Sequence, residues 1–292
     1  MLVPKASLAT ALAAFAASAA LGSTAHAQEV EIRNAVARVV VIPEDRTDIQ
    51  VTVDPGTSGL PAIEVSRRGD DVRLDGGLRR RIQDCQSEGF VANPTEMPDG
   101  IGVTVRGHGT VELSQAPLVV IRTPRDVQID ASGAVWGAIG RSRSTQLGAG
   151  GCGDWSVANT DGSLSIALGG SGNVRAGSAG SGEFALGASG SISTAAIDGP
   201  ADIAIGGSGS VTVASINGAA DIAIGGSGSV RIDGGRVSSL NVAVAGSGGV
   251  VVGATADTVS ASIVGSGDIS VARVTGAVER TILGSGQLRI GN

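Results

Sequence analysis

The sequence predicts an all-β protein, a right-handed parallel β-helix of about ten coils with a period of about 19 residues. The first observation is a Gly-Ser-Gly turn that recurs along the chain. Its closing glycines lie 18 to 20 residues apart, at Gly172, Gly190, Gly209, Gly228, Gly248, Gly267 and Gly286. The second observation is a set of weaker copies upstream, at residues 107–109, 131–133 and 151–153. These turns mark the corners of a repeating coil, because glycine reaches backbone conformations that corners require.

The third observation is that apolar residues stand at fixed offsets from each turn. The second position after the closing glycine is always apolar: Val111, Val135, Trp155, Val174, Ile192, Val211, Val230, Val250, Ile269 and Leu288. Apolar residues alternate with polar ones, which indicates strands with one buried face. Strands this short cannot bury that face alone, so successive units must stack. A β-sandwich or barrel is the alternative, but its hairpins do not normally preserve identical columns. The right-handed winding is expected only because connections between parallel strands are generally right-handed.

Composition narrows the class of protein further. The 292 residues include 47 Gly but only 9 Pro, 3 Phe, 2 Trp and no Tyr. The absence of a Gly-X-Y period excludes collagen, and a hydrophobic content of 42% argues against disorder. With so few aromatic side chains, the protein has little surface on which sugar rings or nucleic-acid bases could stack. The net charge of −6 makes nucleic acid or an anionic membrane a poor partner, and no nucleic-acid partner is expected.

The first 27 residues have the features of a secretory signal peptide. Lys5 precedes an apolar run over 6–21, and residues 25–27 read Ala-His-Ala, the pattern of a cleavage site. We expect cleavage after Ala27, no transmembrane segment in the mature chain, and export to the periplasm or the cell surface. In such a compartment Cys85 and Cys152 are expected to form a disulfide, with two free thiols as the alternative.

The mature chain is expected to have two parts. Residues 28–100 do not follow the 19-residue period and are predicted to form strands and a loop that cap the solenoid, while residues 101–292 form the β-helix. At the other end, Arg280 replaces the apolar residue of an inward column. An inward charge on the last rung would discourage edge-to-edge stacking. The alternative is an irregular last coil in which Arg280 points into solvent.

Two turn-and-strand segments resemble a known family. Residues 207–213 read GSGSVTV and residues 265–271 read GSGDISV. These repeats resemble the GIN domain of bacterial exported proteins, a family of unassigned activity that is named for autotransporter adhesin heads. The resemblance covers roughly residues 100–292. It implies a right-handed parallel β-helix with an adhesin-like role, and it brings no catalytic or binding residues with it.

The sequence gives little support for a metal site, a catalytic site or a glycan-binding site. Calcium-binding β-rolls need an Asp after each turn, and among the seven turns that close at Gly172 to Gly286 only the one at Gly267 is followed by an acid, Asp268, so no metal or cofactor is expected. A polysaccharide-active enzyme or glycan-binding module is the main alternative, and it would need carboxylates in a groove. Asp202 and Asp221 share one column but are expected to be solvated. Trp155 falls in an inward column, whereas Trp136 has an outward phase and is the one aromatic expected to reach a ligand.

One outward column consists almost entirely of small side chains. It contains Ala167, Ala185, Ala204, Ala223, Ala243, Ser262 and Thr281. Such a face is flat, so a partner could pack on it: an unknown envelope protein or glycan, a second copy, or the N-terminal segment. The alternative is that small residues only ease the stacking of coils.

We therefore expect a non-enzymatic, exported interaction or adhesin-like module of the cell envelope. His108 and the run Arg79-Arg80-Arg81 are expected to lie in exposed turns.

Overall fold

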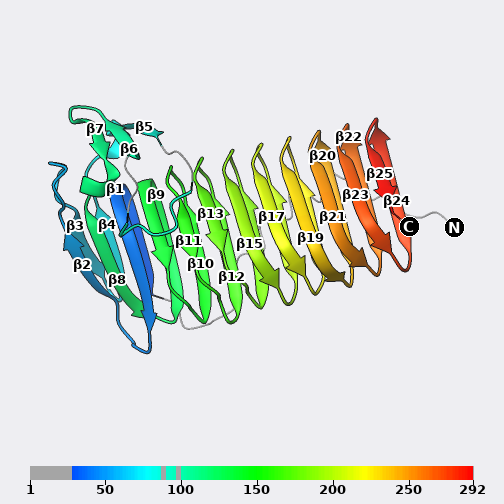
Figure 1. Ribbon diagram of the computed structural model, residues 1–292, viewed down its shortest axis with the longest axis horizontal. Coiled ribbons are helices and arrows are strands. Elements are labelled where there is room, and N and C mark those ends of the chain that lie inside the picture. The colour runs from blue at the N-terminus through cyan, green and yellow to red at the C-terminus, as the bar shows by residue number, and fades with distance from the viewer. Residues whose placement is uncertain (1–27, 87–89, 97–99, 292) are drawn as a thin grey trace.

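The computed structural model describes residues 28–86, 90–96 and 100–291. The predicted signal peptide, residues 1–27, lies outside the described residues. The chain forms a parallel β-solenoid of about nine turns with a period of about 19 residues, which confirms the predicted fold class. Figure 1 shows the rungs stacked side by side into a rod, with the β24 and β25 rung at one end.

Two stacks of strands alternate along the chain, and each strand pairs in parallel with the next but one. The first stack contains β10 (Ser144–Ala149), β12 (Ser163–Leu168), β14 (Ser181–Leu186), β16 (Ala201–Ile205), β18 (Ala220–Ile224), β20 (Leu240–Gly246), β22 (Val259–Gly265) and β24 (Val278–Gly284). The second stack contains β11 (Trp155–Val157), β13 (Asn173–Ala176), β15 (Ser191–Ile197), β17 (Ser210–Ile216), β19 (Ser229–Val237), β21 (Gly249–Ala256), β23 (Asp268–Val274) and β25 (Gln287–Ile290). One strand from each stack makes a rung.

The N-terminal rungs come from two long strands, β1 (Glu29–Glu44) and β9 (Asp126–Ile139). They pair in parallel along most of their length, with a register shift between Ile32 and Ala35. On its other side β1 pairs in parallel with β4 (Asp71–Asp75) and β8 (Leu118–Pro124). β2 (Gln50–Asp54) and β3 (Glu64–Arg68) then add antiparallel edges to β8 and β4. In the segment predicted as a cap, β1 and β4 therefore form rungs of the solenoid, and β2 and β3 are strands at its end.

A small antiparallel sheet is attached to the side of this first part of the rod. It contains β5 (Ile82–Gln86), β6 (Gly102–Val105) and β7 (Gly109–Glu112), flanked by the short helices η1 (Arg79–Arg81) and η2 (Leu113–Gln115). The glycine turn at residues 107–109 is the hairpin between β6 and β7. Our assignment of this turn to a solenoid corner was wrong, because a glycine turn between two alternating strands is compatible with a hairpin as well.

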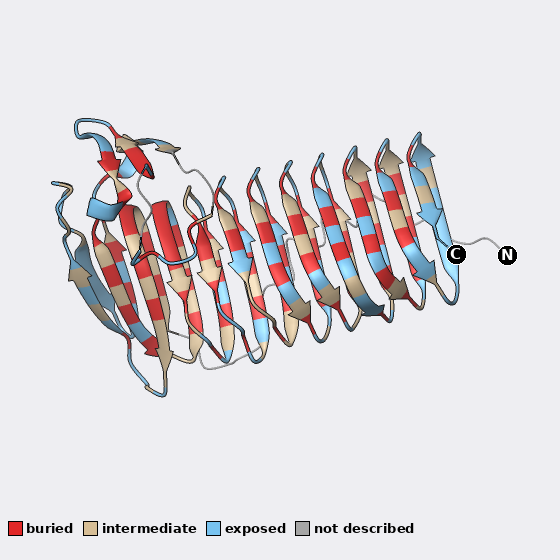
Figure 2. Cartoon of the chain, in the orientation of Figure 1, coloured by how far each residue is buried: buried red, intermediate tan, exposed pale blue. Residues whose placement is uncertain are grey.

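The core follows the inward columns without interruption. Its buried side chains are mainly Val, Ile, Leu and Ala, with Trp155 and Phe184 as the large members, each about 1% exposed. Red inward positions alternate with paler outward ones along most strands of the rod in Figure 2, but not along the last rung. A second, smaller core lies between the appended sheet and the rod. It joins Val36 and Trp136 of the rod to Val103 and Val105 of β6.

The appended sheet is also joined to the rod covalently. Cys85 in β5 forms a disulfide with Cys152, which confirms the predicted pair across 67 residues of sequence. Cys152 lies at a solenoid corner, where its backbone N–H donates to the Gly133 carbonyl at 2.9 Å. Such corners are closely packed: a Cβ on Gly265 would lie 2.4 Å from the Gly246 oxygen, and the φ of Gly265 is +127°. Glycine is required there on both counts.

Candidate functional site

The seven small residues form one ladder on the outward surface of the first stack. Each pairs with the next across successive rungs: Ala167, Ala185, Ala204, Ala223, Ala243, Ser262 and Thr281. Toward the N-terminal end, Gly148 and Asp130 continue the same ladder. The side chains are exposed or half-buried. We call this outward surface of β9, β10 and the rest of the first stack the groove face; its binding role stays a prediction.

A polar column runs beside the small one, two residues earlier in each strand. It contains Gln128, Gln146, Ser165, Glu183, Asp202, Asp221, Asn241, Ser260 and Glu279. Glu183, Asp202 and Asp221 lie on three consecutive rungs, so three carboxylates are stacked about 4.8 Å apart along the rod. Our sequence reasoning paired Asp202 with Asp221 but missed Glu183. Its 19-residue offset from Asp202 was the available signal.

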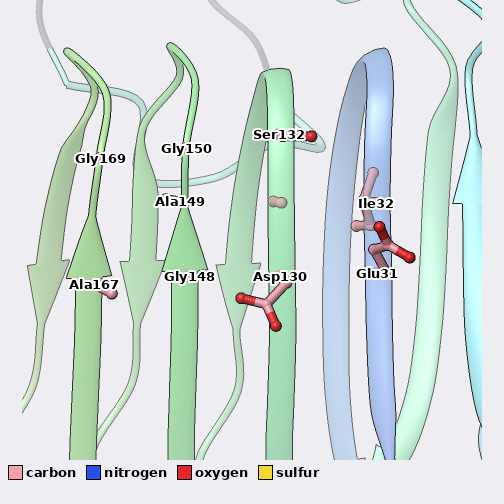
Figure 3. A pocket seen from close by; sticks show the side chains of 10 residues that line it. Glu31, Ile32, Asp130, Ser132, Gly148, Ala149, Gly150, Ala167 and Gly169 are labelled. Carbon is pink, nitrogen blue, oxygen red and sulfur yellow. The ribbon is translucent and has the colours of Figure 1, made fainter. Parts of the chain in front are cut away.

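Three hollows lie on this face. The first, of about 350 Å³, is lined by Glu31, Asp130, Gly148 and Ala167 among others. Figure 3 shows the carboxylate of Asp130 beside the bare backbone at Gly148, with Glu31 on the next strand beyond Asp130. A Cβ on Gly148 would lie 2.0 Å from Oδ1 of Asp130, so this carboxylate takes the space of the missing side chain.

The second hollow, of about 550 Å³, follows the polar column from Gln128 to Asp202 and includes Glu183. A third, of about 210 Å³, continues over Asp221, Ala223 and Asn241. The second hollow is lined by serine, threonine, glutamine and carboxylate side chains with a few apolar ones, and no aromatic or basic residue is among its described lining residues. The face therefore offers many hydrogen-bonding groups on a shallow floor, and its charge is negative.

The stacked carboxylates repel one another electrostatically. Although the Asp202 side chain reaches solvent, the walls of the hollow remove part of its hydration, and this desolvation raises the pKa of Asp202. The carboxylates of Asp221 and Glu183 raise that pKa further. The amide of Asn241 donates to Asp221 at 2.7 Å. None of the three carboxylates belongs to an ion pair within the described part of the chain.

A second acidic group lies at the N-terminal end of the groove face. Partial burial raises the pKa of Glu29, and a hydrogen bond with Asp130 raises it further. Glu31 differs because it forms an ion pair with Arg73 of β4. At this end only Glu31 is balanced by an arginine, whereas Glu29, Asp130 and the carboxylates of the middle rungs have no ion pair among the described residues.

Trp136, the aromatic that the sequence marked for a ligand contact, is not accessible to a ligand. The residue does point outward from the rod, but the appended sheet covers it and leaves it about 1% exposed. Its indole Nε1 has no hydrogen-bond partner among the described residues. The prediction was wrong because the sequence does not reveal that β5, β6 and β7 fold back over this part of β9.

The loop beyond β5 is attached close to the same place. The buried carboxylate of Asp154 accepts the backbone N–H of Val91 at 3.2 Å and that of Asn173 at 3.0 Å. The guanidinium of Arg175 lies over the Phe90 ring, 4.2 Å from its centroid. These contacts assign Asp154 and Arg175 a structural role, which removes them from the candidate site.

Arg280 lies in register with Ala261 of the inward column, and the side chain is exposed at the end of the rod. Its role in preventing edge pairing stays a prediction. In the described ranges no group of three or more His, Cys, Asp or Glu is placed to hold a metal ion. Among the residues that the structure describes, no helix is long and apolar enough to span a membrane.

Comparisons with known proteins give no family assignment. No family model matches the chain, so its resemblance to GIN domains stays a prediction. A search of the curated proteins found no match either. Among solved structures, one from Parabacteroides distasonis ATCC 8503, described provisionally as an adhesin, is 19% identical over 92% of this chain and 94% of that chain, with a TM-score of 0.48.

Two further solved structures are more distant. One from the same organism, described provisionally as a lipid-binding protein, is 13% identical over 91% of this chain and 93% of that chain, with a TM-score of 0.40. Another from Clostridium sporogenes ATCC 15579, described provisionally as a cell adhesion protein, is 10% identical over 91% and 92% of the two chains, with a TM-score of 0.20. Sequence identities and TM-scores this low carry no argument about function, so the function of this chain has to be argued from its own residues.

Proposed function

We propose that this protein is an exported, non-enzymatic β-solenoid that serves as an adhesin-like interaction module of the cell envelope. It binds an extended partner along the groove face. The observation that carries this proposal is the ladder of small side chains, flanked on consecutive rungs by the stacked carboxylates of Glu183, Asp202 and Asp221. The disulfide supports export, because such bonds persist mainly in oxidising compartments.

The shape of the face favours a partner that is extended along the rod. Small side chains leave the floor flat, and each rung repeats the same chemistry about every 4.8 Å. A chain-like partner can therefore make the same contact on several rungs. Because the carboxylates form no ion pairs in the described structure, the best fit is a polypeptide segment that presents Lys or Arg side chains. An uncharged, hydroxyl-rich glycan is the second choice.

The proposal can be tested with an oligolysine peptide as a probe of the cationic segment. We expect salt-sensitive binding to the wild-type protein, and loss of that binding in the D202N/D221N variant. The D198N/D268N variant is the matched control, because it removes the same charge from positions outside the groove face. Equal weakening in both variants would mean that only net charge attracts the peptide, which would contradict the proposal.

The compartment needs a separate experiment. Protease treatment of intact cells, compared with cells whose outer membrane has been permeabilised, distinguishes the cell surface from the periplasm. Cleavage on intact cells supports an adhesin at the surface. Protection until permeabilisation supports a periplasmic scaffold and contradicts the adhesin role. Degradation in the cytoplasmic fraction alone would contradict export.

A second candidate function rests on one specific observation. Glu183 and Asp202 line the same hollow, and the pKa of Asp202 is raised, as a general acid in polysaccharide cleavage requires. The described lining has neither an aromatic platform for a sugar ring nor a basic residue, which is why we rank this function second. Release of reducing sugars from envelope polysaccharides by the wild-type protein, abolished in D202N, would establish it.

A further inference from the structure

A basic cluster lies on the appended sheet, and its member Arg79 lines a hollow of about 470 Å³ between this sheet and the rod, together with Asp84 and Ser132. Antiparallel pairing of Ile82 with Val105 brings the end of η1 beside the β6–β7 hairpin. Three arginines of η1 thereby meet two residues of the hairpin that are 25 or more positions away in sequence. We call this group the basic tip; it contains Arg79, Arg80, Arg81, Arg106 and His108.

Backbone contacts fix the geometry of the basic tip. The N–H of Arg106 donates to the Arg81 carbonyl at 2.8 Å, and Nε of Arg81 donates back to the Arg106 carbonyl at 3.2 Å. The hairpin closes with a bond from the His108 N–H to the Val105 carbonyl at 2.9 Å. Arg79, Arg80, Arg106 and His108 remain exposed.

Within the part of the chain that the structure describes, the tip arginines differ from most arginines of the rod because they form no ion pair with an acidic side chain. Arg33, Arg46, Arg73, Arg122, Arg125, Arg141, Arg143, Arg231 and Arg236 each form an ion pair with an Asp or Glu. No ion pair within the described ranges involves a tip arginine. The nearest described carboxylates on this sheet are Asp84, opposite Thr104, and Glu112, opposite Gly102 at the other end of β6.

The appended sheet holds this cluster in a fixed position beside the first rungs of the rod. The second core and the Cys85–Cys152 disulfide hold the sheet against the rod. Figure 1 shows β6 and β7 projecting beside the first rungs, and Figure 2 shows their connecting turn as exposed. The exposed side chains of Arg80, Arg106 and His108 therefore display positive charge on a projecting part of an otherwise acidic protein.

We infer that the basic tip docks on the surface of an anionic phospholipid bilayer. Guanidinium groups bind phosphate strongly and in a bidentate way, and each arginine close to an anionic surface strengthens adsorption. A projecting tip can touch a plane of headgroups, whereas a single polymer chain is better held in a groove. Repulsion of the acidic rod from the same surface would orient the molecule tip first. The chain's net charge led us to discount such a surface, because composition does not show that arginines 79–81 and 106 meet.

The inference is tested by co-sedimentation with lipid vesicles, using the chain from Gln28 onward, which contains all the described strands. We expect binding to vesicles that contain phosphatidylglycerol and none to pure phosphatidylcholine vesicles. In the R79Q/R80Q/R106Q variant the partition coefficient should fall about a hundredfold, the loss expected when three arginines leave an anionic surface. Arg81 is kept because it supports the hairpin.

The matched control is R231Q/R273Q/R289Q, which removes the same charge from the rod and should bind almost as the wild type does. Circular dichroism confirms that both triple variants are folded. Equal loss in the two variants would overturn the inference, because adsorption would then follow net charge alone. Failure of the wild type to bind phosphatidylglycerol vesicles would overturn it too. Retention on a soluble sulfated polysaccharide without vesicle binding would instead assign the tip to an anionic glycan.

Discussion

At the scale of single residues, Trp136 points outward from the rod but has the role of a core residue, because the appended sheet covers it. The indole fills the second core between the rod and the appended sheet, and its Nε1 makes no hydrogen bond to the described residues. We expect Trp136→Ala to lower the free energy of unfolding by about 3–5 kcal/mol, as for other large buried aromatics. Trp136→Phe keeps most of the apolar volume and sacrifices no hydrogen bond, so it should cost less than about 1.5 kcal/mol. Urea denaturation measures both, and equal losses would contradict this description of the site.

Asp202 is the residue whose ionisation should weaken the fold. Its pKa is raised in the folded protein, so the charged form is less stable there than in the unfolded chain. The effect is absent at a pH below the ordinary pKa of an Asp, where both states are protonated. It appears as the pH rises through the raised pKa, so Asp202 costs stability at neutral pH.

We therefore predict that Asp202→Asn stabilises the protein at pH 7 by about 0.2–1 kcal/mol, the range for relieving like charges on neighbouring strands. At pH 3 the variant and the wild type should be equally stable. Asp233→Asn is the control, because Asp233 is paired with Arg231 and its loss brings no relief. Thermal unfolding at the two pH values measures the difference, and a gain that persists at pH 3 would contradict a charge effect.

At the scale of elements, the appended sheet depends on its attachment to the rod. The disulfide links β5 to a corner 67 residues away, and removal of such a bond commonly costs about 2–4 kcal/mol. We expect the C85S/C152S variant to lose stability in this range. Amide exchange should become faster in β5, β6 and β7 while the strands β16 to β21 stay protected. Faster exchange along the whole rod would show that the disulfide supports the solenoid itself.

The last rung is the element most exposed to unwanted pairing. Val278, Leu283 and Ile290 are about 40%, 60% and 38% exposed there, and Arg280 continues an apolar inward column. We predict that Arg280→Leu promotes end-to-end association, because it removes the charge that a stacked second rung would have to bury. Arg289→Leu is the control, since Arg289 occupies an outward position of β25. Sedimentation velocity measures the association, and monomers in both variants would contradict the prediction.

The elements also show what the sequence could and could not predict. The inward columns from β10 to β25 were predictable, because a strict period fixes both the strands and their register. The place of β1 was not, since its partners β4, β8 and β9 lie 40 to 100 residues away and share no turn motif with it. The hairpin at 107–109 was mistaken for a corner because the same residue types serve both. On the groove face, the columns followed from the period, but the hollows and the shifted pKa of Asp202 depend on packing that only the structure reveals.

At the scale of the whole molecule, charge is distributed in a way that fits an interaction module. The middle rungs of the groove face carry stacked carboxylates without ion pairs in the described structure, and the appended sheet carries an equally uncompensated group of arginines. A solenoid holds such surfaces at a fixed distance from each other, because every rung is bonded to its neighbours. The two surfaces can therefore engage two different partners at once.

The most direct test of the central claim is carboxylate footprinting of the protein in its native envelope and after purification. Carbodiimide labelling reports which Asp and Glu side chains are accessible. If a partner occupies the groove face, Glu183, Asp202 and Asp221 will be protected in the envelope and labelled in the purified protein, while Asp198 and Asp268 are labelled in both. Protection should disappear in the A204R/A223R variant, whose long side chains obstruct the face, and persist in S193R/T212R on the second stack. Equal labelling of the three carboxylates in the envelope and in the purified protein would contradict the account.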